Sequence, residues 1–113
     1  MSADLFVAFY GVRYDIAVDS PEVDLLEAET HPLIVTAREN ALDVWWSGLT
    51  NDNETIYPLF IGKQLALVGH GYDMERRVSA EDLLAAVHEM PLKFQNAGLQ
   101  EIPELILQIE VAA

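Results

Sequence analysis

The chain has 113 residues, no cysteine, and 19 acidic against 6 basic residues, which give a formal net charge of −13 at pH 7. This length predicts one domain (residues 1–113), and the missing cysteine excludes disulfide bonds, thiol nucleophiles and thiolate zinc sites. A field of this sign repels nucleic-acid phosphates and anionic lipid, so we expect neither nucleic acid nor a membrane as a direct partner.

The N-terminal region predicts the compartment and the first strand. No basic stretch precedes its apolar residues, and no apolar run reaches the roughly 18 residues that span a bilayer. Together with the absence of cysteine, this predicts a cytoplasmic protein. Residues 5–14 are apolar at nearly every position, which predicts a central strand buried on both faces. Gly11 indicates a bulge or a close backbone approach, and Arg13 is the natural partner of a nearby acid.

Residues 15–29 hold six acids and no base. The Ser20-Pro21-Glu22 sequence within them suits a helix start, because Ser caps, Pro fits the first position and Glu favours the helix dipole. We predict a short helix over residues 21–29 that ends before Pro32. Residues 33–40 follow as a second short helix, although their first residues would serve equally well in a strand.

A three-strand meander is predicted over residues 43–70. Residues 43–49 read as its first strand, and two apolar runs, 56–61 and 65–68, follow after a polar turn. Gly62 separates the two runs and suits the first central position of a type II′ hairpin turn.

The C-terminal part predicts one long helix and one strand. Ser79 is a suitable N-cap, and apolar residues recur at helical spacing over residues 80–97. Pro91 predicts a kink or a restart, and Gly98 supplies the C-terminal cap. Residues 104–111 then alternate as a half-exposed strand. One face of it carries Leu105, Leu107, Ile109 and Val111, and the other carries Glu104, Ile106, Gln108 and Glu110.

The predicted fold class is α+β, a two-layer domain with about five antiparallel or mixed strands and a central meander. The long helix (80–97) and one or two short helices (21–40) cover one face of the sheet. Because the strands are apolar on both faces, we also expect a homodimer.

The sequences WWSG (45–48) and FIGK (60–63), followed by Leu65 and Gly69, resemble a pattern in small uncharacterised bacterial or phage proteins. The resemblance spans about half of the chain and its motifs are structural in type. It implies a bacterial or phage origin and carries no activity.

One grouping could support catalysis or metal binding. His70, Asp73 and Glu75 follow the predicted meander, and a histidine with two carboxylates can hold a divalent metal or form an acid–base pair. Their spacing matches no established motif. His31 and His88 are interpreted as a loop residue and a surface residue.

Two pairs of residues could contribute to an interface. Adjacent strand residues point to opposite faces, so one of Trp45 and Trp46 enters the core and the other lies under a helix or anchors a partner. Arg76 and Arg77 either grip an acidic group on a second copy or neutralise neighbouring acids such as Glu75.

The function that we expect is a non-enzymatic, acidic protein–protein interaction module that binds a basic partner, in its sharper version an inhibitor that mimics nucleic acid. We expect no cofactor and no metal. The predicted partner-binding residues are Asp15, Asp19, Glu22, Asp24, Glu27, Glu29, Trp45, Trp46, Arg76 and Arg77. Two alternatives stay open: a small metal- or ligand-dependent enzyme with a site at His70, Asp73 and Glu75, and a structural subunit of a larger complex.

Overall fold

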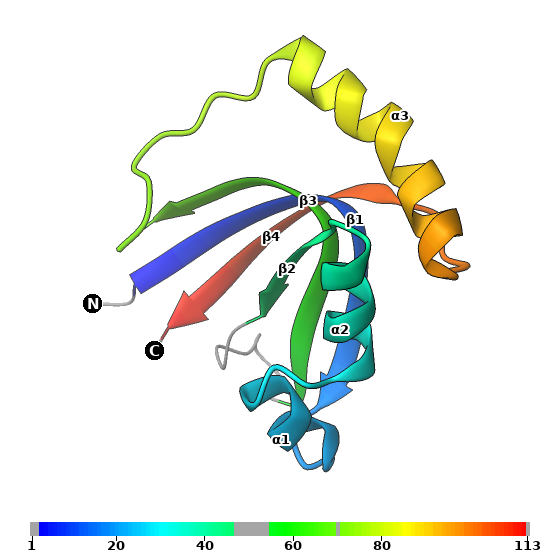
Figure 1. Ribbon diagram of the computed structural model, residues 1–113. Coiled ribbons are helices and arrows are strands. Elements are labelled where there is room, and N and C mark those ends of the chain that lie inside the picture. The colour runs from blue at the N-terminus through cyan, green and yellow to red at the C-terminus, as the bar shows by residue number, and fades with distance from the viewer. Residues whose placement is uncertain (1–2, 47–54, 70, 113) are drawn as a thin grey trace.

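The computed structural model describes residues 3–46, 55–69 and 71–112 (Figure 1). Their elements are, in chain order, β1 (Ala3–Ala17), α1 (Glu22–Glu27), α2 (Pro32–Glu39), β2 (Asp43–Trp46), β3 (Ile56–Gly69), α3 (Ala80–Ala97) and β4 (Glu104–Ala112). The strands form one four-stranded sheet with the order β2-β3-β1-β4, and every neighbouring pair is antiparallel. The α+β class is therefore confirmed, and the fifth strand that the sequence predicted is absent from the described residues.

The predicted hairpin at Gly62 is wrong, because β3 runs as one strand of 14 residues through both apolar runs. The two runs do not pair with each other. They pair in succession with β1, whose 15 residues offer a partner for the whole length of β3. Gly62 lies opposite Gly11 and has a φ of 149°, a conformation that side chains disfavour.

β1 is the central strand, as predicted, with β3 on one side and β4 on the other. Gly11 provides the close backbone approach that its position indicated. A Cβ atom there would overlap the carbonyl oxygen of Ile61 and the backbone of Gly62. The register of β1 against β3 shifts between Ala8 and Phe9, so the bulge lies two residues before this glycine.

The main core lies between the helices and one face of the sheet. Leu26 of α1, Ile34 of α2 and Phe94 of α3 are fully buried with Leu59 and Ile61 of β3. The two short helices agree with the sequence, and the strand alternative for residues 33–40 is wrong. None of the helices in the described ranges is both long and apolar enough to cross a bilayer.

The helix α3 spans the 18 residues from Ala80 to Ala97. The Ser79 hydroxyl accepts a hydrogen bond from the amide of Asp82 at 3.0 Å, which caps its first turn. Pro91 lies inside the helix, which runs through this residue without restarting. Gly98 ends it with a φ of 76°, the left-handed C-cap that the sequence predicted.

The opposite face of the sheet holds a second apolar cluster made of strand residues. Leu5, Val7 and Phe9 of β1 are buried there with Phe60 of β3. The rings of Phe9 and Phe60 stack with their centroids 5.4 Å apart. Both faces of the central strands are therefore buried, as the apolar runs indicated.

β4 is half-exposed, as predicted, but its apolar row is the exposed one. The side chains of Leu105, Leu107 and Ile109 face solvent, whereas Gln108 and Glu110 are buried. The register explains this arrangement. Residues directly opposite each other share a face of the sheet, and Gln108 and Glu110 lie opposite the buried Val7 and Leu5 of β1.

Candidate functional site

The acidic segment, residues 15–29, leaves the end of β1, turns, and forms α1. Figure 1 shows α1 at the lower end of the molecule, far from α3. Leu26 of α1 is buried and Val23 packs partly buried against the main core, whereas the acidic side chains of the helix are exposed. Six carboxylates of this segment lie at exposed positions: Asp15, Asp19, Glu22, Asp24, Glu27 and Glu29.

Three of these six carboxylates have partners within the chain. Asp15 lies 3.0 Å from Nε of Arg13, which confirms that Arg13 pairs with a nearby acid. Glu29 lies 2.8 Å from a guanidinium nitrogen of Arg38. The third, Glu22, contacts the ring of His31.

The other three acids remain uncompensated. Within the described part of the chain, no hydrogen bond or ion pair engages the carboxylates of Asp19, Asp24 and Glu27. All three are exposed and lie within nine residues of sequence. The structure therefore concentrates unpaired negative charge on α1 and on the turn that precedes it.

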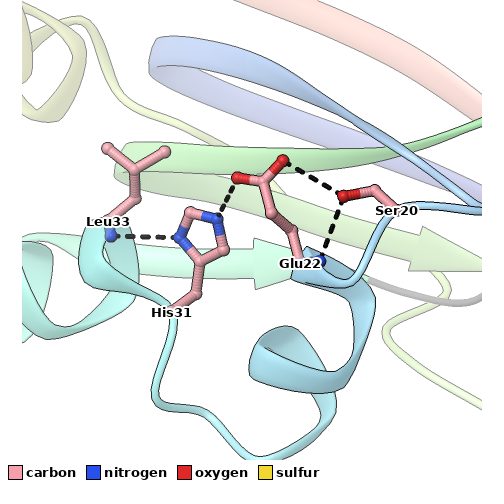
Figure 2. A network of polar contacts seen from close by, with 4 residues as sticks. All are labelled: Ser20, Glu22, His31 and Leu33. Carbon is pink, nitrogen blue, oxygen red and sulfur yellow. Dashed lines mark hydrogen bonds and ion pairs between the residues drawn. The ribbon is translucent and has the colours of Figure 1, made fainter.

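His31 links α1 to the start of α2 through a network of polar contacts, a role that the sequence analysis missed (Figure 2). Its ring is buried, and Nδ1 accepts a hydrogen bond from the amide of Leu33 at 3.1 Å, which caps α2. An accepting Nδ1 places the proton of the neutral ring on Nε2, which contacts Oε1 of Glu22 at 2.9 Å. The Ser20 hydroxyl in turn accepts a hydrogen bond from the amide of Glu22. The network fixes α1 against α2.

Tyr14 connects the acidic end of β1 to the segment that precedes β4. Its hydroxyl donates a hydrogen bond to Glu101 at 3.1 Å. Burial raises the pKa of the Tyr14 phenol well above its usual value, and the hydrogen bond to the Glu101 carboxylate and the charge of that group raise it further. The phenol therefore stays protonated as a donor.

The two tryptophans lie opposite Phe60 and Leu59 of β3 and so face opposite sides of the sheet, as predicted. Trp45 packs against the second apolar cluster, and its ring meets that of Tyr72 edge to face at 5.6 Å. Trp46 packs against the main core. Both side chains are half-buried.

The two predicted arginines, Arg76 and Arg77, lie on the segment that joins β3 to α3. Arg77 neutralises Glu75 at 3.5 Å, one of the two roles that the sequence left open. Arg76 lines a pocket of about 270 Å³ between β3 and α3, together with Lys63, Asp82 and Glu89. Acidic and basic side chains thus share this pocket.

Of the three residues named for the metal alternative, His70 lies outside the described residues. Asp73 and Glu75 are exposed, and Glu75 is engaged by Arg77. Among the residues that the structure describes, no three histidine, aspartate or glutamate side chains gather closely enough to hold a metal ion. His88 lies on the surface of α3, as predicted.

The sequence analysis also missed a buried polar row on β4. Arg13 donates a hydrogen bond to Oε1 of Gln108 at 2.6 Å. Nε2 of Gln108 and Nε1 of Trp45 are buried with no hydrogen-bond partner among the described residues. The alternation of β4 was visible in the sequence, but the identity of its inward row depends on the register with β1.

Comparisons with known proteins give no relative for this chain: no family model, no curated protein and no solved structure matches it.

Proposed function

We propose that this protein is a non-enzymatic interaction module that binds a basic protein surface through the acidic segment 15–29. The observation that carries the proposal is the set of three exposed carboxylates, on Asp19, Asp24 and Glu27, that no described residue neutralises. The proposal retains the cytoplasmic location and the homodimer that the sequence predicted.

A basic partner gains most from carboxylates that have no partner inside the chain. An acid that already contacts a base inside the chain gains little from a second base. An exposed, unpaired carboxylate gains about 0.2–1 kcal/mol from each new ion pair. The net charge of −13 adds a long-range field that speeds the approach of a basic partner. Asp19, Asp24 and Glu27 should therefore contribute most of the binding energy from this segment.

The finer version of the proposal is nucleic-acid mimicry. Carboxylates on α1 and its preceding turn would occupy the places on a basic protein where phosphates bind. A partner of this kind would bind this protein and nucleic acid through the same basic surface. Short duplex DNA should then compete with this protein for the same partner, whereas a partner with another kind of basic surface would bind both at once.

The experiment is a capture with tagged protein at low and at high salt, followed by quantitative binding to the recovered partner. The test variant carries Asp19→Asn, Asp24→Asn and Glu27→Gln. We expect a loss of affinity of roughly 3- to 150-fold, since three exposed pairs contribute roughly 0.6–3 kcal/mol. Binding of the unaltered protein should weaken steeply as salt rises, because salt screens exposed charges.

A matched control separates the acidic surface from net charge. Asp4→Asn, Glu89→Gln and Glu104→Gln remove three exposed carboxylates elsewhere on the chain. The two variants have the same net charge, so only the position of the change differs. Equal losses in both would reduce the effect to net charge, and binding that is insensitive to salt would refute the proposal.

A further inference from the structure

The exposed row of β4 is an apolar surface at the edge of the sheet. Leu105, Leu107 and Ile109 expose 49%, 60% and 55% of their surface. Phe6 of β1 lies directly opposite Ile109 and is 37% exposed. These four residues form one patch without a charged side chain, which we call the β4 patch. A contiguous apolar patch of this kind commonly marks an interaction site.

The backbone of β4 is also available for pairing. β4 is the last strand of the sheet, so β1 is its one strand neighbour in the described part of the chain. Its nine residues contain no lysine, arginine or proline, and its register with β1 has no shift. Charged side chains, proline and bulges are the usual devices that prevent a sheet edge from pairing with another strand. Of the two charged residues in β4, Glu104 is its first residue and Glu110 is buried.

The alternation of β4 makes this edge complementary to itself. In an antiparallel pair of two β4 strands, residues on one face of one strand meet residues on the same face of the other. With a two-fold axis at Leu107, Leu105 lies opposite Ile109 of the second copy. With the axis at Gln108, Leu107 lies opposite Ile109 of the second copy. In either register the two apolar rows become continuous. The axis at Leu107, however, would place Glu104 directly opposite Glu110 of the second copy, and like charges in that position destabilise a strand pair. The axis at Gln108 avoids this contact, because Glu104 then lies opposite Ala112.

The net charge of the chain also favours β4 as the site where two copies associate. Two chains of net charge −13 repel each other, so their association is favoured where the contact surface carries little exposed charge. The β4 patch meets that requirement, whereas the acidic segment does not. A basic partner, in contrast, would be drawn to the acidic segment and would gain nothing electrostatic from the β4 patch.

We propose that a second copy of this chain docks on β4, so that the two sheets join edge to edge across a two-fold axis at Gln108. The pairing would extend the four-stranded sheet to eight strands and bring the two β4 patches side by side. This inference names the interface of the expected homodimer. It does not depend on the acidic segment binding a basic protein.

Sedimentation equilibrium over a range of protein concentrations tests the proposal. The unaltered protein should form a dimer, and its dissociation constant should fall as salt rises, since salt screens the repulsion between the two acidic chains. Leu107→Glu should raise the dissociation constant about 100-fold or more, because it places a charge in each apolar row. Leu107 is exposed in the single chain, so circular dichroism should show a folded variant.

Leu92→Glu is the matched control. Leu92 lies on α3 with 63% of its surface exposed, and the substitution adds the same charge. It should leave the dissociation constant within about threefold, a difference below 1 kcal/mol. A monomeric unaltered protein at every concentration would overturn the proposal, whether or not the variant folds. Equal effects of the two substitutions would also overturn it, since the contact would then lie elsewhere.

Measuring both dimerisation and partner binding in each variant distinguishes this proposal from the proposed function. Leu107→Glu should retain binding to a basic partner, and the Asp19, Asp24 and Glu27 variant should retain the dimer. Loss of both properties in either variant would contradict the separation of the two surfaces.

Discussion

An inner strand and an edge strand of the sheet use apolar residues in opposite ways. Beneath the helices, the apolar residues of β3, such as Leu59 and Ile61, point into the core. At β4, the apolar residue Leu107 points outward while the neighbouring Gln108 is buried. The first region completes its core within one chain. The second region, β4, carries a row of leucine and isoleucine side chains like those of a core, but no described residue covers this row.

The energetic difference between the regions is substantial. Full burial of a leucine or isoleucine side chain contributes about 1.5–3 kcal/mol. Leu105, Leu107 and Ile109 are each about half-exposed, so each chain forgoes part of that energy at three positions. Pairing of two β4 strands would recover part of this energy in both chains at once. We therefore expect substitutions at the centre of the sheet to affect folding strongly and substitutions at its edge to affect association.

The largest expected effect is at Gly11, where the two regions join. Gly11→Ala should destabilise the protein by about 3 kcal/mol or more, because the added Cβ would overlap the backbone of Ile61 and Gly62. Both strands would have to separate, and neither is free to move. Urea unfolding followed by circular dichroism measures the change.

Gly98→Ala is the control for this prediction. Gly98 also has a positive φ, but a Cβ there meets no atom within 4 Å. Its substitution should cost only about 1 kcal/mol, from backbone strain alone. Similar losses for the two alanine variants would show that the contact between β1 and β3 is looser than described.

The next effect tests the region under the helices. His31→Ala removes the cap of α2 and the contact with Glu22, and should cost about 1–2 kcal/mol in the free energy of unfolding. His31→Asn should recover part of that loss, because asparagine also accepts the amide of Leu33. If the alanine variant were as stable as the unaltered protein, the His31 network would not stabilise this region.

The smallest expected effect concerns Tyr14, whose hydrogen bond to Glu101 joins the covered region to the segment before β4. Tyr14→Phe should lower stability by about 0.5–1 kcal/mol at neutral pH. The raised pKa of Tyr14 means that the unfolded chain loses this proton first, near pH 10. Unaltered protein should therefore lose stability as the pH rises above about 10, and the phenylalanine variant should lose less.

Unfolding at neutral pH and at about pH 11 measures this difference. The gap between the unaltered protein and the phenylalanine variant should narrow at the higher pH. Glu101→Gln keeps the phenol and its burial but removes the neighbouring charge, so its pH dependence should be intermediate. A constant gap would mean that Tyr14 is not held in its protonated form.

Local signals in the sequence predicted the helices well. Ser20-Pro21-Glu22, Ser79 and Gly98 lie at or beside the ends of helices in the structure, because capping chemistry depends on neighbouring residues. The course of β3 could not be predicted in the same way. Gly62 is compatible both with a tight turn and with an extended strand, and only the length of β1 decides between them.

In the candidate site, too, local features were predictable from the sequence and tertiary contacts were not. The acidic character of residues 15–29 is visible in the sequence, but the pairing of Glu22 and Glu29 with residues nine positions later is not. The unpaired acids could therefore be identified only from the structure. For β4, the alternation was predictable, whereas its inward row follows from the register with β1, a tertiary contact.

The most direct test of this contrast is hydrogen exchange of the backbone amides at low and at high protein concentration. If a second copy covers the edge of the sheet, amides of β4 should become more protected as concentration rises, while those of α1 and α2 stay unchanged. Protection of β4 that is independent of concentration would contradict the account, because the edge strand would then be complete within one chain.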